Sequence, residues 1–103
     1  MYSILFLPIA KKDINDILFY MSIILKNKKA SQSFMKEFIK KINSLLVFPY
    51  GEPVYDYDNK LHYEYRCLRV KNYLLFYVID ESKKTIIISR ILYNKTNIYN
   101  FLD

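Results

Sequence analysis

The stretch from Tyr63 to Tyr93 constrains the fold most, because it contains three β-strand patterns in tandem. It reads YEYRCLRVKNYLLFYVIDESKKTIIISRILY, in which short polar turns separate runs rich in β-branched and aromatic residues. Strands joined by turns this short pair in antiparallel fashion, so the segment predicts a three-stranded meander. The run from Leu74 to Ile79 is apolar at every position, which indicates a central strand covered on both faces.

The first half of the chain predicts a strand followed by two helices. Residues 2 to 7 are strand-like and are closed by Pro8, which suits the first turn of a helix. Apolar residues then recur at spacings of three and four to about residue 25, so they predict a helix with one core-facing stripe. That stripe comprises Ile14, Ile17, Leu18, Met21, Ile24 and Leu25.

A second helix is predicted after the lysine-rich segment 26–29. Ser31 is a plausible N-cap, and the helix ends before Phe48-Pro49. Its apolar stripe comprises Phe34, Phe38, Ile42, Leu45 and Leu46. Two amphipathic helices joined by a short polar turn pack as an antiparallel hairpin.

These patterns predict an α+β fold in one domain that spans residues 1–103. An N-terminal strand and an antiparallel helical hairpin pack on an antiparallel sheet that contains the C-terminal three-stranded meander. Residues 49 to 62 contain two prolines and the single glycine, so they read as a long loop. Residues 94 to 102 form either a short helix or an extended tail.

The charge balance favours an anionic partner. Sixteen basic residues against ten acidic ones give a net charge of +6 and a pI near 9.3, which suits an acidic protein or a nucleic acid; the alternative is charge that serves only solubility. With one cysteine no intramolecular disulfide is possible, so a reducing, cytoplasmic location is predicted. No apolar run reaches the roughly 18 residues of a membrane span, and no membrane partner is expected.

The three arginines, Arg66, Arg69 and Arg90, all lie in the meander, whereas the other thirteen basic residues are lysines. Only arginine has the planar fork that binds phosphate or carboxylate through two hydrogen bonds. Arg66 and Arg69 are three residues apart, so they point to opposite faces of a regular strand. Arg90 shares a face with one of them or forms a salt bridge across the meander, with Glu64, Asp80 or Glu81 as its partner.

Other reactive residue types are sparse. His62 is the single histidine and Cys67 the single cysteine, and together they cannot supply the three or four ligands that zinc needs. Cys67 is expected to face the core as a small hydrophobic residue. Glu52, Asp56 and Asp58 cluster in the long loop, but without the spacing of a calcium loop. No metal site and no cofactor are predicted.

Four motifs in order resemble the ParE/RelE superfamily of toxins from bacterial type II toxin-antitoxin modules. PIAKKDINDILFYM resembles the family's opening helix, and LLVFPYGEPV resembles its helix end and FP-x-G-x-P-V loop. YRCLRVKNYLLFYVID is similar to the Y-R-x-L-x-V-x-N-Y-x-x-x-Y stretch, and ISRILYNKTNIYNFL to the closing R-V-L-H segment. The resemblance implies a cytoplasmic toxin that a cognate, acidic antitoxin holds inactive.

The superfamily has two branches. One resembles RelE and cleaves messenger RNA on the ribosome, and the other resembles ParE and inhibits DNA gyrase. Carried over from the ribonuclease branch, the catalytic positions are Arg66, supported by Arg69, and Lys95 and Tyr99. Arg90 and Tyr73 are the candidates for binding phosphate or a target.

Two departures from the ribonuclease pattern favour the ParE branch. Leu74 stands directly after Tyr73, where the pattern has an arginine, and leucine neither binds phosphate nor moves a proton. Lys95 stands for another arginine and keeps the charge without the fork. We therefore expect a gyrase inhibitor. The alternatives are an RelE-like endoribonuclease, which would make the protein an enzyme, and an inactive homologue retained for antitoxin binding.

Overall fold

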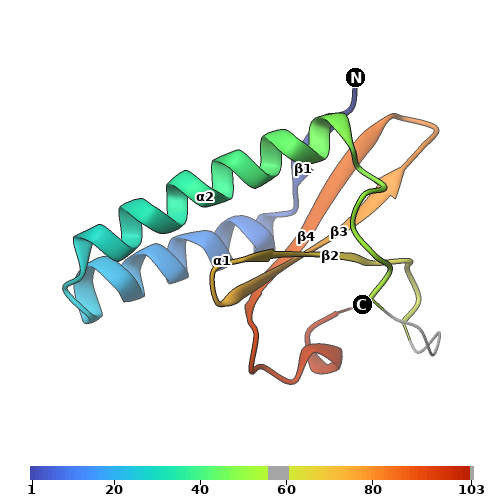
Figure 1. Ribbon diagram of the computed structural model, residues 1–103. Helices are drawn as coiled ribbons and strands as arrows, with labels where there is room; N and C mark the ends of the chain where they lie inside the picture. Colours follow the sequence, from blue (N-terminus) through green and yellow to red (C-terminus); the bar gives the residue numbers. More distant parts are fainter. Residues whose placement is uncertain (56–60, 103) are drawn as a thin grey trace.

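The computed structural model describes residues 1–55 and 61–102 and contains a four-stranded sheet with a long helical hairpin on one side (Figure 1). The elements follow in the order β1 (Ser3–Phe6), α1 (Pro8–Phe19), η1 (Tyr20–Ile24), α2 (Lys28–Val47), β2 (Arg66–Val70), β3 (Tyr73–Asp80), β4 (Thr85–Tyr93) and η2 (Ile98–Asn100). The predicted α+β fold is confirmed.

The sheet has the strand order β1-β4-β3-β2. The predicted meander is confirmed: β2 pairs with β3 and β3 with β4, both antiparallel. The antiparallel arrangement is limited to these strands, because β1 joins the edge of β4 in parallel, with Ser3 opposite Thr85 and Phe6 opposite Ile88. The sheet is therefore mixed. The parallel pairing of β1 with β4 is possible because the helical hairpin and the loop after it carry the chain from β1, at one edge of the sheet, to β2, at the opposite edge.

The two helices form as the apolar periodicity predicts, but the turn between them differs from the expectation. Pro8 occupies the first turn of α1, where its missing N–H costs no hydrogen bond. The N-cap of α2 is Asn27, whose side chain accepts a 3.0 Å hydrogen bond from the backbone N–H of Ala30. The prediction of Ser31 as the cap is wrong, because α2 starts one turn earlier than the apolar stripe suggested.

The last two residues of the first apolar stripe do not face the core as the periodicity predicted. Ile14, Leu18 and Met21 pack against the core, but Ile24 is 57% exposed and Leu25 is 53% exposed. The helix widens into the π-helix η1 after Phe19, and Leu25 N–H donates to the carbonyl oxygen of Tyr20, five residues back. This last turn lies in the end of the hairpin that extends past the strands of the sheet (Figure 1).

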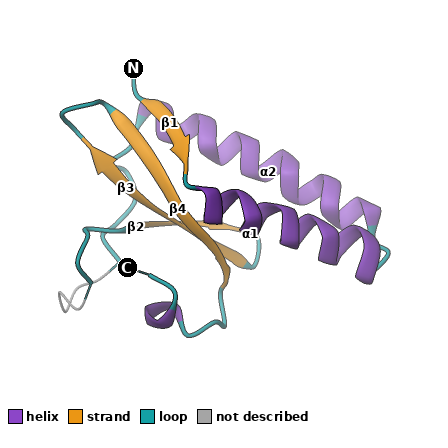
Figure 2. Cartoon of the chain, turned by 180° about the vertical axis from the view of Figure 1, so that it is seen from behind, coloured by secondary structure: helices purple, strands orange, loops and turns teal. Residues whose placement is uncertain are grey.

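Two apolar clusters cover the two faces of the sheet. The larger one lies under the hairpin and includes Phe34, Phe38, Leu75, Tyr77 and Ile88. The smaller one lies on the opposite face, where the C-terminal tail passes (Figure 2). Its buried members are Tyr65, Phe76, Leu92, Ile98 and Leu102. The tail thus contains one short helical turn, η2, and supplies the second cover that the apolar strand β3 requires.

The long loop after α2 is fastened to the sheet at several points. The hydroxyl of Tyr77 donates a 2.7 Å hydrogen bond to the carbonyl oxygen of Pro49 under the hairpin. Val54 forms an isolated antiparallel bridge with Arg66, which extends the edge of β2 by one pair. Asp56 and Asp58 of the acidic loop cluster lie outside the described residues.

Among the described residues, no helix combines the length and the apolar character that crossing a bilayer requires.

Candidate functional site

Arg69 lines an open pocket on the sheet face opposite the hairpin, which we call the sheet-face pocket. It has a volume of about 390 Å³. Its lining residues are Glu52, Pro53, Val54, Tyr55, Cys67, Arg69 and Leu74. The register pairs Arg69 directly with Leu74 across β2 and β3. The leucine therefore stands beside Arg69, at the position where the ribonuclease pattern has a second cation.

Arg66 lies on the other face of β2, as the spacing of three residues predicted. Its Nη1 donates a 2.6 Å hydrogen bond to the carbonyl oxygen of Glu52 and a longer one, 3.4 Å, to that of Tyr50. Its guanidinium also lies 5.0 Å from the centre of the Tyr50 ring. Arg66 thus holds the loop after α2 and does not join Arg69 in one site.

Arg90 forms a largely buried ion pair with Asp13 of α1. Its Nε and Nη2 donate to the two carboxylate oxygens at 2.8 and 2.9 Å, and the side chains are only 16% and 11% exposed. This bidentate contact raises the pKa of Arg90 further above its usual value. The expected partners across the meander, Glu64, Asp80 and Glu81, are wrong. The partner comes from the helix: Arg90 stands opposite Phe76, whereas Asp80 stands opposite Thr85 at the other end of the β3–β4 pair.

Lys95 and Tyr99 lie in the segment after β4. Lys95 is exposed in the turn that follows the strand. Tyr99 belongs to η2, and its ring centre is 5.8 Å from that of Tyr55 in the sheet-face pocket. The tail therefore brings Tyr99 to the side of the molecule that carries Arg69, whereas Arg66 remains on the hairpin side.

Cys67 does not have the environment of a catalytic nucleophile. Burial raises the pKa of Cys67 to about 12, so the thiol stays protonated at neutral pH. This agrees with the expectation that Cys67 packs as a small hydrophobic residue against the second core. His62 is exposed and makes an edge contact with Tyr63. In the described part of the chain, no three His, Cys, Asp or Glu side chains are grouped as metal ligands.

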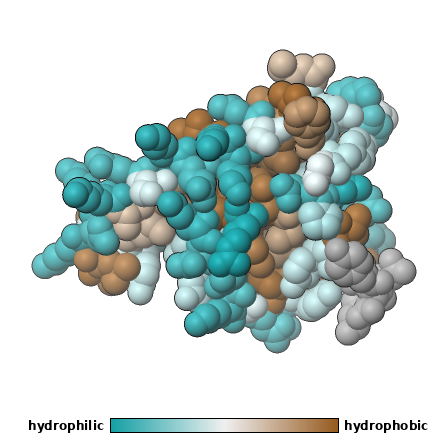
Figure 3. Space-filling model, in the orientation of Figure 1, coloured by the Kyte–Doolittle hydropathy of each residue, from teal (hydrophilic) through white to brown (hydrophobic). Residues whose placement is uncertain are grey.

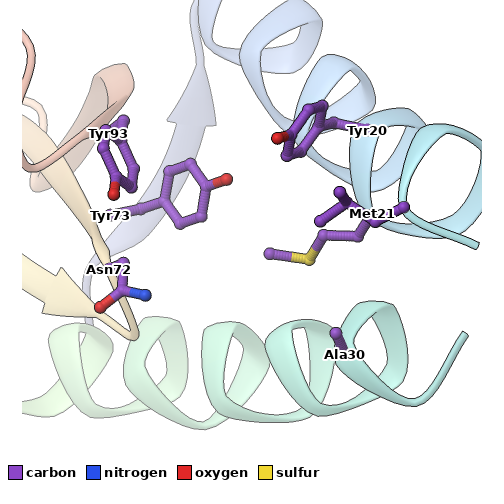
Figure 4. A pocket seen from close by; sticks show the side chains of 7 residues that line it. Tyr20, Met21, Ala30, Asn72, Tyr73 and Tyr93 are labelled. Carbon is purple, nitrogen blue, oxygen red and sulfur yellow. The ribbon is translucent and has the colours of Figure 1, made fainter. Parts of the chain in front are cut away.

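The larger pocket lies between the hairpin and the β2–β3 turn, and we call it the hairpin pocket (Figure 4). Its volume is about 530 Å³. It is lined by Tyr20, Met21, Leu25, Ala30, Asn72, Tyr73 and Tyr93. The hydroxyl groups of Tyr20 and Tyr73 point toward one another across the opening, and Met21 extends into it (Figure 4). An apolar hollow rimmed by hydroxyls suits a large apolar side chain of a partner.

Tyr73 is fixed at this pocket by rings on both sides. Its ring centre is 5.5 Å from that of Phe34 and 5.7 Å from that of Tyr93, both in edge geometry. Burial, followed by the nearby Tyr20 and Tyr93, raises the pKa of Tyr73, so its hydroxyl is a hydrogen-bond donor at neutral pH. Tyr73 lines the hairpin pocket, on the opposite sheet face from Arg69, and its contact with a target stays a prediction.

The family follows from comparison with known proteins. The profile of the ParE toxin of the type II toxin-antitoxin system parDE matches residues 4–98. The chain belongs to the ParE toxin family. Residues 4–98 run from β1 to the start of η2 and so include both pockets of this ParE-family toxin.

A solved structure has the same fold. The chain is similar to a protein of the chromosomal ParDE toxin-antitoxin system from P. aeruginosa, with a TM-score of 0.68. The two sequences are 15% identical, and the match covers 90% of this chain and 96% of the other. At this identity the likeness concerns the fold alone. The search of curated proteins found no match.

Sequence reasoning did not find the hairpin pocket as a site. Tyr20, Asn72 and Tyr93 are far apart in the chain, so no local pattern connects them. Two signals were present. The segment Ile17–Leu25 is too apolar for one buried stripe, and aromatic residues stand at both Tyr73 and Tyr93, the facing ends of two strands. Asp13 was also missed, because a single carboxylate in a polar helix face gives no pattern.

Proposed function

We propose that this ParE-family toxin is neutralised by an acidic antitoxin and, when free, inhibits DNA gyrase without cleaving RNA. One observation carries the choice of target. Arg66 and Arg69 lie on opposite faces of β2, and Arg66 is engaged with the carbonyl oxygens of the loop after α2. A transesterifying ribonuclease needs its cations, acid and base converged on one phosphate. The divergence of the two arginines, with Leu74 beside Arg69, supports a binding inhibitor.

The hairpin pocket is the proposed docking point of the antitoxin. It offers apolar volume between a helix pair and a sheet, and a partner helix with a large apolar anchor fits such a groove. Lys26, Lys28 and Lys29 stand in the sequence between Leu25 and Ala30, two residues that line the pocket, and the chain carries a net charge of +6. Complementary charge on an acidic partner speeds and orients the encounter.

A supercoiling assay tests the proposed target. Purified gyrase is incubated with relaxed plasmid, ATP and increasing amounts of the free protein, and we expect supercoiling to fall. Protein that has been premixed with the product of the small gene encoded beside it should leave supercoiling intact. Because both samples contain the same toxin, this control separates inhibition from an impurity.

Primer extension on translated messages provides the second arm. New 5′ ends in the message, with gyrase unaffected, would contradict the proposal and support the ribonuclease, with Arg69, Lys95 and Tyr99 as the residues to substitute first. If neither gyrase nor message is affected and the adjacent gene product still binds tightly, the protein is an inactive homologue. The ribonuclease is tested because Tyr99 and Arg69 lie on the same side of the molecule, where both could contact one phosphate.

A further inference from the structure

The far end of the helical hairpin is apolar around its whole circumference. From Ile17 to Leu25 the only polar side chain is Ser22, apart from the tyrosine hydroxyl of Tyr20. A helix that packs on one face needs one apolar stripe, so an all-round apolar segment is normally covered on every side. Here Ile17 is buried. By contrast, the side chains of four residues are more than half exposed: Phe19, Ile23, Ile24 and Leu25, at 56%, 56%, 57% and 53%.

This segment projects beyond the sheet. The hairpin extends past the strands, and the turn between η1 and α2 forms its free end (Figure 1). In the space-filling view the same end carries an apolar patch with hydrophilic residues around it (Figure 3). We call residues 19–29 the hairpin tip. Ser22 satisfies its hydroxyl within the helix, through a 2.6 Å hydrogen bond to the carbonyl oxygen of Leu18, so this hydroxyl does not oppose burial of the apolar segment.

The charge around the tip has one sign. No aspartate or glutamate occurs between Asp16 and Glu37, whereas four lysines, Lys26, Lys28, Lys29 and Lys36, lie in that interval. Lys28 and Lys29 occupy the first turn of α2, where the positive end of the helix dipole disfavours a cation. The tip is therefore electropositive, and only an anionic partner relieves this repulsion. A second copy of the chain in a tip-to-tip contact would bring the lysines together.

We propose that the hairpin tip is a peripheral membrane-binding surface that inserts its apolar side chains into an anionic lipid bilayer. The tip is a convex end with apolar and cationic side chains within eleven residues of one another, which matches the boundary between acyl chains and headgroups. Lysine stems reach back to lipid phosphates while their methylenes stay in the apolar layer. A surface of this kind needs no spanning helix. This proposal departs from the expectation, drawn from the sequence, that the protein has no membrane partner. Only the structure reveals that Ile24 and Leu25 are exposed. The inference does not rest on the proposed gyrase target. Tyr20, Met21 and Leu25 of the tip also line the hairpin pocket, so an antitoxin bound there and a bilayer would compete for this end of the molecule.

Vesicle flotation with the full chain tests this surface. We expect the protein to float with vesicles of phosphatidylcholine mixed with phosphatidylglycerol and not with vesicles of phosphatidylcholine alone. Added salt should weaken the binding, since each lysine near an anionic surface contributes roughly fivefold to partitioning. The double variant Ile23→Ser, Ile24→Ser should lose about tenfold or more, because it removes the inserted apolar groups.

Matched variants separate the tip from the rest of the surface. Ile39→Ser with Val47→Ser removes two equally exposed apolar side chains, 53% and 60%, elsewhere on α2, and should bind vesicles like the parent. Lys26→Gln, Lys28→Gln and Lys29→Gln together should abolish most of the dependence on phosphatidylglycerol. Lys11→Gln, Lys40→Gln and Lys83→Gln make the same change in net charge away from the tip and should retain it to a larger extent.

Three results would overturn the proposal. The first is flotation that is equal with both kinds of vesicle or equal for the tip variants and their controls. The second is no flotation with either kind of vesicle. If the Ile23→Ser, Ile24→Ser variant then also loses affinity for the adjacent gene product, the tip is a protein interface. The third is sedimentation analysis in which the parent chain is a dimer and the same variant is a monomer. Circular dichroism of each variant verifies that the fold is intact.

Discussion

Three lysines adopt left-handed backbone conformations at turns: Lys26 with φ 51°, Lys71 with φ 55° and Lys84 with φ 48°. A residue with a Cβ atom is strained there by roughly 1 kcal/mol, whereas glycine is not. The single glycine of the chain is elsewhere, at residue 51. Each turn therefore forms because the elements on either side require it, and these lysines carry a local strain that the tertiary structure imposes.

Lys71 offers the clearest test of this strain. It occupies the turn between β2 and β3, and its backbone N–H and carbonyl groups make the hydrogen bonds there, to Glu37 and from Arg69. We expect Lys71→Gly to raise the free energy of unfolding by about 0.5–1 kcal/mol. The measurement is the midpoint of urea denaturation. Lys83→Gly, in the neighbouring β3–β4 turn, is the control and should lower stability, so a loss in both variants would contradict the assignment of strain to Lys71.

At the scale of elements, one ion pair joins three of them. Asp13 of α1 accepts hydrogen bonds from Arg90 of β4 and from the backbone N–H of Ile91 at 3.0 Å. The same guanidinium lies over the ring of Phe101 in the tail, 5.5 Å from its centre. Arg90 thus connects the helix, the sheet and the tail.

Removing one partner of this pair should be costly. Asp13→Ala leaves Arg90 without its carboxylate in a largely buried place, and we expect a loss of about 3 kcal/mol in the free energy of unfolding. Asp16→Ala removes a carboxylate from the exposed Lys12–Asp16 pair on the same helix and should cost less than about 1 kcal/mol. Thermal denaturation of both variants gives the comparison. Equal, small losses would mean that the buried pair contributes no more than a surface pair.

At the scale of the whole molecule, Glu81 connects segments that are distant in the sequence. Its carboxylate accepts hydrogen bonds from the hydroxyl groups of Tyr2 and Tyr50, and it pairs with Lys84 at 2.6 Å. The N-terminus, the loop after α2 and the β3–β4 turn therefore meet at one exposed group. Hydrogen bonds from Lys84 and Tyr2 lower the pKa of Glu81 to about 2.

This lowered pKa predicts a contribution to acid stability. The ionised carboxylate is favoured in the folded state, so its stabilisation is fully present above the ordinary pKa of about 4.5 and is lost as the pH falls from there toward 2. Glu81→Gln should flatten the decline of stability over that interval, measured by urea denaturation at several pH values. Glu64→Gln removes an exposed carboxylate from the loop before β2 and serves as the control. An unchanged pH profile for Glu81→Gln would exclude this role.

The hairpin pocket predicts the effect of filling it. Ala30 lines the pocket from α2, so Ala30→Trp should occupy volume that the antitoxin's apolar anchor needs and weaken binding about tenfold or more. Ile39→Trp enlarges an exposed position of the same helix outside the pocket and should bind normally. Calorimetric titration with the adjacent gene product provides the affinities. If Ala30→Trp folds and binds like the parent, the antitoxin docks elsewhere.

The local patterns were sufficient for most elements. Periodicity predicted both helices, and Pro8 and Phe48-Pro49 marked their limits because proline removes a backbone donor and restricts the residue before it. Alternation and turn residues predicted the meander. The opposite orientation of Arg66 and Arg69 also followed from spacing alone, since the side-chain period of a strand is two. All these features depend on residues close together in the chain.

What the sequence by itself determined is therefore the type and order of the elements, together with the family that their motifs resemble. Only the tertiary structure decided which distant groups meet: Asp13 with Arg90, Tyr20 with Tyr73, and the tail with the second face of the sheet. It also decided that β1 lies parallel to β4 and that Ile24 and Leu25 stay exposed. The physical reason is range. Local propensity acts over a few residues, whereas pairing and burial depend on the closure of long loops, which leaves no periodic signal in the sequence.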